Sequence, residues 1–259
     1  MLLIQAGTPP EDIRAVAGDL PQWFLAAIGR SPEAVAVDVD VVRVFEGEPL
    51  PEPGRHRAAI ITGSWSMVTD QHPWSEAAAS WIRQAAAQGM PLLGVCYGHQ
   101  LMAHALGGTV GYHPGGREMG CLDVEQLPTG GSDPWLAGCP PRFKAHLTHL
   151  QTVLRLPAGA RALARSAHDP HQIVRYSLTA VSVQFHPEFT PDIQAACIGA
   201  RAQVLRSEGL DPSAMLRGLG PTPVPLALLQ RFVQTHAAPK PANTAQAMPH
   251  PATDRHLPA

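Results

Sequence analysis

A cysteine flanked by two glycines is the residue of this sequence best suited to do chemistry. Cys96 lies in the segment Gly94-Val95-Cys96-Tyr97-Gly98, where an apolar run typical of a buried strand meets a stretch with helical spacing. A sharp turn brings neighbouring backbone close to the nucleophile. The positions two residues before and two residues after it then have no room for a side chain and require glycine. The following helix would offer free N–H groups and a partial positive charge, and both favour a thiolate. The pattern predicts a nucleophilic Cys96 at the carboxyl end of a strand.

A lone cysteine in an apolar run also suits a core residue, so a nucleophile needs a base. A candidate base is His186, which stands where an apolar strand ends. An acid, Glu188, follows it two residues later. Side chains two positions apart can face the same way, so Glu188 can hold one ring nitrogen of His186 while the other faces the thiol. This spacing suits a Cys-His-acid triad. Together the two segments predict a cysteine hydrolase with Cys96, His186 and Glu188 as its catalytic residues.

Both segments resemble the signature motifs of class I glutamine amidotransferases. The match covers residues 94–100 and 184–188, and the glutamine amidotransferase domain of GMP synthase is the most similar member. The resemblance extends over roughly residues 1–190. It implies the same roles for the triad and a flavodoxin-like α/β fold.

A third segment, residues 62–68, resembles the glycine turn of the same family. The resemblance implies that the backbone N–H groups of Gly63 and Tyr97 form an oxyanion hole. The family usually has proline where Trp65 stands.

A fourth segment, residues 147–153, resembles the family's Ser-His-Gly-Asp-x-Val stretch, whose backbone holds the amino-acid end of the substrate. Leu150 and Gln151 stand in place of Gly and Asp, and the resemblance gives them this substrate-binding position. Gln100 matches a residue that helps to bind glutamine, although a packing role is the alternative. His149 is a second candidate for the base, but it lacks a neighbouring acid.

Short apolar runs alternate with helical patterns along most of the chain. The expected strands are residues 2–6, 34–45, 58–62, 91–95, 121–127 and 172–185, the last with a turn near residue 177. The expected helices are residues 11–28, 73–89, 100–106, 191–206 and 225–235. Strands that are apolar on both faces and alternate with helices indicate a mostly parallel, doubly wound sheet with helices on both faces. We expect one such domain over residues 1–236, followed by a Pro/Ala-rich tail, residues 237–259, that is disordered.

The composition of the 259 residues excludes several other classes. A formal charge of -2 leaves no basic surplus for a nucleic-acid partner. No stretch approaches the ~20 apolar residues of a membrane span, and the N-terminus lacks the basic region of a signal peptide, so we expect a cytoplasmic protein. The cysteines are isolated and no zinc-ligand spacing is present, which predicts reduced thiols and no metal. These cysteines are Cys96, Cys121, Cys139 and Cys197.

The implied reaction is acyl transfer and needs no cofactor. The thiolate attacks the γ-amide carbon, backbone N–H groups bind the oxyanion, His186 protonates the departing ammonia, and water releases glutamate. The sequence contains no phosphate-binding P-loop motif, so we expect a glutaminase that serves a separate ammonia-accepting synthetase. A stand-alone hydrolase of γ-glutamyl compounds is the alternative. The intact triad disfavours a non-catalytic, regulatory relative.

Overall fold

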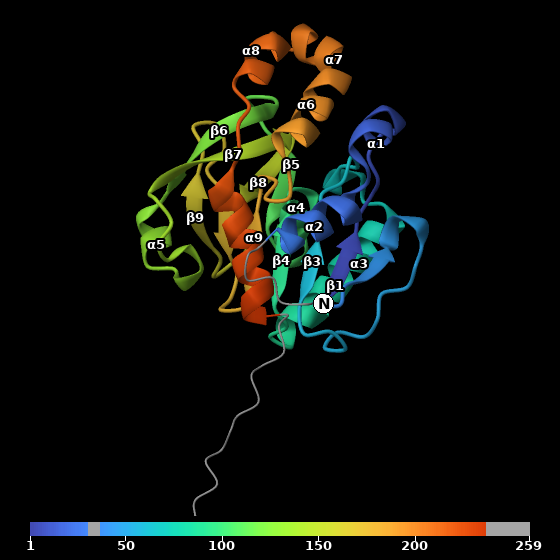
Figure 1. The fold of residues 1–259 in the computed structure, drawn as a ribbon. Helices are drawn as coiled ribbons and strands as arrows, with labels where there is room; N and C mark the ends of the chain where they lie inside the picture. Colours follow the sequence, from blue (N-terminus) through green and yellow to red (C-terminus); the bar gives the residue numbers. More distant parts are fainter. Residues whose placement is uncertain (31–36, 237–259) are drawn as a thin grey trace, which may run out of the picture.

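Nine of the strands that the structure describes form one mixed sheet (Figure 1). The computed structural model describes residues 1–30 and 37–236. The strands are β1 (Leu2–Gln5), β2 (Asp40–Arg43), β3 (Ala59–Ile61), β4 (Leu92–Val95), β5 (Thr109–Tyr112), β6 (Glu118–Gln126), β7 (Arg142–His149), β8 (Gln151–Arg155), β9 (Arg161–Arg165), β10 (Ile173–Arg175) and β11 (Ala180–Val183). The order is β2-β1-β3-β4-β11-β10-β9-β6-β7, while β5 and β8 form a separate antiparallel pair. Strands β2 to β11 in this order are parallel, and the other four pair antiparallel.

Helices cover both faces of the parallel part of the sheet. The described helices are α1 (Glu11–Ala17), α2 (Leu20–Gly29), α3 (Pro73–Ala87), α4 (Tyr97–Ala105), α5 (Pro128–Gly131), α6 (Pro191–Ala200), α7 (Ala202–Ser207), α8 (Pro212–Arg217) and α9 (Pro223–His236); α2, α3, α4 and α9 lie on the two faces. Alternate strand residues divide between two apolar clusters because successive side chains point to opposite faces. Leu3, Ile60 and Leu93 pack with α2 and α9, whereas Leu2 and Leu92 pack with α3 and α4. The doubly wound arrangement expected from the sequence is confirmed.

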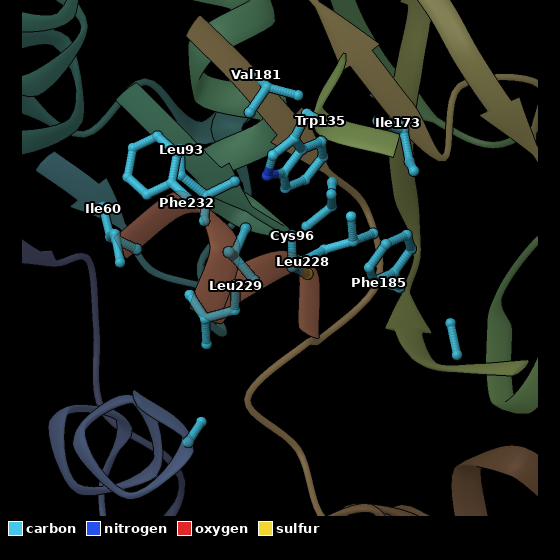
Figure 2. Close-up of a cluster of buried hydrophobic side chains, with 14 of the residues drawn as sticks. Ile60, Leu93, Cys96, Trp135, Ile173, Val181, Phe185, Leu228, Leu229 and Phe232 are labelled. Atoms are coloured by element: carbon cyan, nitrogen blue, oxygen red, sulfur yellow. The ribbon is translucent and has the colours of Figure 1, made fainter. Parts of the chain in front are cut away.

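The cluster on the α9 face shows how this layer reaches the predicted nucleophile. Leu228, Leu229 and Phe232 of α9 lie among strand side chains, and Cys96 belongs to the same buried cluster (Figure 2). The thiol therefore packs against the apolar layer formed by α9 and the strands. Such a layer resists displacement of the side chains at its edge.

A third apolar cluster lies beyond the carboxyl ends of the parallel strands. It joins Ile13 of α1, Phe189, and Ile193 and Cys197 of α6. Helices α6, α7 and α8 continue from it at the end of the molecule to which β1 points (Figure 1). The carboxyl edge of the sheet, where α/β proteins bind ligands, is thus partly covered by helices.

The helix expected over residues 11–28 is divided in two, which corrects the sequence-based interpretation. Gly18 has a φ of 81° and ends α1, and the Asp19 side chain caps α2 by accepting from the N–H of Leu20. The side-chain oxygen of Gln22 accepts a hydrogen bond from the backbone N–H of Asp19, which completes a capping box. The apolar periodicity continued across the break and concealed it.

The strand expected over residues 34–45 is also shorter than predicted. Strand β2 begins at Asp40, and Val44–Glu46 form a 3-10 turn. Residues 34–36 lie outside the described part of the chain, as does the tail that we expect over residues 237–259. The expected strands and helices at residues 58–62, 73–89 and 91–95 are confirmed within two residues at each end.

The antiparallel part of the sheet was mostly missed. Strands β7, β8 and β9 carry polar and apolar residues without the continuous apolar character of the central strands. The run at 172–185 is a hairpin of β10 and β11, with its turn at the expected position. Among the described helices, none combines the length and the apolar character that crossing a bilayer needs.

Candidate active site

Cys96 occupies a strained turn between β4 and α4. Its φ of 51° and ψ of -100° lie outside the regions that side chains normally adopt. A Cβ on Gly94 would lie 2.5 Å from the carbonyl oxygen of Gly98, and a Cβ on Gly98 would lie 2.3 Å from that of Ile61. Both flanking glycines are therefore required by backbone contacts. Strain of this kind is concentrated at functional sites.

The Gly98 contact gives a stability prediction. In Gly98→Ala the new Cβ meets a backbone oxygen of β3, which cannot rotate away, so we expect a loss of about 3 kcal/mol in the free energy of unfolding. Chemical denaturation measures it. Gly199→Ala is the control, because a Cβ there meets no heavy atom within 4 Å and should slightly stabilise α6. Equal stability of the two variants would contradict the packing of α4 on β3.

His186 and Glu188 lie next to Cys96 because β11 pairs with β4. Val183 is in register with Val95, and the N–H of Cys96 donates to the carbonyl of Val183 at 2.9 Å. Three residues later, His186 Nδ1 lies 2.7 Å from Glu188 Oε1, with the Glu188 side chain fully buried. The spacing predicted for this pair is thus present as a contact.

The second ring nitrogen of His186 is buried and has no hydrogen-bond partner among the described residues. Burial alone would lower the pKa of His186, but the charges of Glu188 and Cys96 raise it to about 10. The imidazolium form is therefore favoured, which suits a pair with a cysteine thiolate. Phe189 stacks on the ring at 4.0 Å between centroids and fixes its plane.

The predicted oxyanion donors lie beside this pair. A Cβ on Gly63 would lie 3.0 Å from Cε1 of His186 and 3.7 Å from Cβ of Cys96, so only glycine lets the turn approach both residues. The N–H of Gly98 donates to the carbonyl of Thr62 at 3.1 Å and ties the two turns together. Within the described chain, the N–H groups of Gly63 and Tyr97 donate to no other protein group. Both are available to a substrate oxygen.

The predicted substrate-binding residues are held by contacts inside the protein. Gln100 Nε2 donates to the carbonyl of Gln151 at 2.7 Å and to Oε1 of Gln184 at 2.9 Å. The Gln151 side chain accepts from the N–H of Val68 at 3.1 Å. The backbone carbonyl of Leu150 accepts from His113 at 3.0 Å. These bonds position β8 beside the 68–70 turn, and a contact to substrate stays a prediction.

His149, the alternative base, is excluded by its hydrogen bonds. Its Nδ1 lies 3.0 Å from the carbonyl oxygen of Gln151, and its Nε2 lies 2.8 Å from Glu118 Oε2. The expectation that His149 lacks an acid was wrong, because Glu118 stands 31 residues away in sequence but opposite it on β6. Neither ring nitrogen is free to serve Cys96.

Two other histidines are buried in a neutral form. Burial lowers the pKa of His99 to about 3 and that of His146 to about 4. The backbone carbonyl of His146 accepts a 2.9 Å hydrogen bond from the N–H of His186. Both residues take up a proton when the chain unfolds in mild acid.

We therefore expect stability to be complete above about pH 6.5 and to fall as the pH drops toward 4. His146→Leu removes one titrating group. Between pH 6.5 and 4 the free energy of unfolding of this variant should fall by up to about 3 kcal/mol less than that of the parent. Denaturation at a series of pH values measures the two slopes. Identical slopes would show that His146 does not take up a proton on unfolding.

Sequence reasoning missed the residues that surround the triad. Trp23 packs edge-on against Phe189 at 5.4 Å and against Trp65 at 6.4 Å, and Arg201 lies over the Trp65 ring. No local pattern marks these residues, because they come from three separate parts of the chain. In the described residues, no group of three or more His, Cys, Asp or Glu side chains could hold a metal.

Comparison with known proteins finds relatives that are named for glutamine hydrolysis. GMP synthase (glutamine-hydrolyzing) of Aeropyrum pernix is 38% identical over 142 residues, which are 55% of this chain and 25% of the relative. One subunit of GMP synthase (glutamine-hydrolyzing) from Thermococcus kodakarensis is 36% identical over 100 residues, or 38% of this chain and 51% of the relative. This chain thus matches a quarter of the first relative's length and half of the second's.

Solved structures share the fold. A glutamine amidotransferase from Thermotoga maritima has a TM-score of 0.72 at 23% identity and covers 90% of this chain and 96% of its own. A glutamine amidotransferase from Methylobacillus flagellatus has a TM-score of 0.66 at 24% identity and covers 90% of each chain. A family model, glutamine amidotransferase class-I, matches residues 23–199. The chain belongs to the class I glutamine amidotransferase family.

Proposed function

We propose that the protein hydrolyses the γ-amide of glutamine through a thioester on Cys96 and releases ammonia for a separate synthetase. The observation that carries the proposal is the convergence of Cys96, the His186–Glu188 pair and the Gly63 turn at one edge of β4. Family membership supports the substrate class. The similarity to a single GMP synthase subunit supports an acceptor on another chain.

The proposed acyl-transfer step uses the groups of this site. The Cys96 thiolate forms a bond to the γ-carbon, and the carbonyl electron pair moves to the oxygen, where the N–H groups of Gly63 and Tyr97 bind it. His186, protonated and held by Glu188, gives its proton to the nitrogen as the C–N bond breaks and ammonia leaves. A water molecule then loses a proton to His186 and attacks the thioester. Glutamate leaves and the thiol is restored.

The resting site is closed, which bears on the rate. Cys96 is only 6% exposed, and the His186 and Glu188 side chains are buried with it. If one oxyanion donor is misplaced until a partner docks, the cost is about 2.7 to 4 kcal/mol, roughly a hundredfold or more in rate. We expect the isolated chain to hydrolyse glutamine weakly.

The test offers the purified protein glutamine and γ-glutamyl dipeptides and measures the release of glutamate and ammonia. Weak glutamine hydrolysis that rises when cell extract is added, but not with the Cys96→Ala variant in the same extract, would support the proposal. The variant corrects for glutaminases of the extract itself. Brisk, saturable turnover of a dipeptide with little action on glutamine would instead identify a stand-alone γ-glutamyl hydrolase.

A further inference from the structure

The guanidinium of Arg201 lies near the active site without an anionic partner. Arg201 connects α6 to α7, two residues beyond the end of the family match at residue 199. Its Cζ lies 5.6 Å from the centroid of the Trp65 ring. Its Nη1 is buried and has no hydrogen-bond partner among the described residues. No carboxylate in the described chain forms an ion pair with it.

Trp65 connects Arg201 to the reacting groups. It stands two residues after Gly63, on the turn that faces both His186 and Cys96. Burial lowers the pKa of Arg201; Cys197, one helical turn earlier, opposes this effect, Arg117 adds to it, and Cys96 and Asp12 oppose it. Arg201 is therefore a cation at the edge of the closed site.

A buried guanidinium N–H without an acceptor is costly, so an unpaired one needs an explanation. Two other arginines whose side chains are largely covered have their acceptors. Arg175 makes two bonds to Asp133, at 2.9 and 2.7 Å, and Arg117 makes two bonds to Glu208, at 2.9 and 3.1 Å. The face of Trp65 attracts a cation but accepts no such pair of bonds. Nη1 of Arg201 thus has room for an acceptor that the described residues do not supply.

We propose that Arg201 binds a carboxylate of the substrate and so selects glutamyl compounds. This inference rests on the proposed function. A planar guanidinium recognises a carboxylate through two parallel hydrogen bonds. The carboxylate has two possible sources: the α-carboxylate of the glutamyl unit, or the carboxylate of an amino acid released from a γ-glutamyl peptide.

The test compares the parent protein with Arg201→Gln and Arg201→Lys on three substrates. Glutamine and γ-glutamylethylamide carry only the α-carboxylate, whereas γ-glutamylglycine adds a second one on the leaving group. A second measurement needs no turnover. It compares the rate at which a glutamine-like chloroketone labels Cys96 with the rate for iodoacetamide; the chloroketone carries an α-carboxylate and iodoacetamide does not. Arg175→Gln is the matched control, because Arg175 is a buried arginine that already has its acid, Asp133. Melting temperatures check folding.

If Arg201 binds the α-carboxylate, Arg201→Gln raises KM roughly ten- to a hundredfold for all three substrates, with kcat little changed. It also slows the chloroketone but not iodoacetamide, and Arg201→Lys restores part of the loss. If Arg201 binds the leaving group, only γ-glutamylglycine is affected. KM values and labelling rates within twofold of the parent would overturn the assignment while leaving the proposed function intact. A parent protein that neither releases glutamate nor reacts with the chloroketone would contradict both.

Discussion

Cys96→Ala is expected to abolish glutamate release and to leave the fold intact. The change removes the nucleophile but keeps the Cβ in a turn whose strain belongs to the backbone. Loss of the nucleophile in a catalytic triad typically costs about a millionfold in kcat, which reduces turnover to background. Only one sulfur leaves the apolar cluster beneath the turn, so the expected loss in the free energy of unfolding is about 1 kcal/mol.

Steady-state glutamate release and thermal unfolding measure the two effects separately. Cys121→Ala and Cys139→Ala are the controls, because both are free cysteines outside the triad, and both should keep parental activity. If Cys96→Ala kept even a tenth of the parental rate, the thioester route would be wrong. If it unfolded instead, the turn would depend on the sulfur itself.

His186→Ala is the second large expected effect, and it should cost far more rate than Glu188→Gln. The histidine moves the proton twice in each cycle, whereas the acid orients the ring and stabilises its charge. In comparable triads the base is worth roughly one to two orders of magnitude more in kcat than the acid. Since Glu188 raises the pKa of His186 and the protonated ring is the proton donor, Glu188→Gln should also shift the alkaline limb of the rate profile to lower pH.

Alkylation by iodoacetamide gives an independent measure of the same pair. Because a histidine beside a cysteine promotes its reaction with alkylating agents, His186→Ala should slow the labelling of Cys96 near pH 7. His149→Ala is the comparison, because its ring is held by Glu118 and Gln151 and its loss should affect stability or substrate binding. An inactive His149→Ala beside a near-normal His186→Ala would show that the base is assigned wrongly.

The parts of the fold predicted correctly are those in which local pattern and tertiary environment agree. The central strands are apolar on both faces because helices cover both, and α3 carries a regular apolar stripe. Strands β7 and β9 pair antiparallel with β6 near one edge of the sheet, and β8 pairs with β5 outside it; exposed positions dilute the apolar signal of all three. The break between α1 and α2 did leave a local sign, Asp19 with Gln22 three residues later, but the apolar spacing on both sides dominated the interpretation.

The candidate triad could be proposed from the sequence because each of its residues lies in a short segment whose spacing suits its chemistry. Cys96 stands between two glycines, and His186 stands two residues before its acid. The remaining features of the site depend on contacts between distant segments. The pairing of His149 with Glu118 requires the β6–β7 register, and the position of Arg201 over Trp65 requires α6 to lie across the carboxyl edge of the sheet.

The most direct test of the central claim is to detect the acyl-enzyme. The protein is mixed with glutamine, quenched in acid within the first turnovers, digested, and analysed by peptide mass spectrometry. The thioester route predicts a glutamyl group on the peptide that contains Cys96, absent from Cys96→Ala and enriched when hydrolysis is slowed by Glu188→Gln. A glutamyl group on Cys121, Cys139 or Cys197 instead, or glutamate release with no modified Cys96 under any quench, would contradict it.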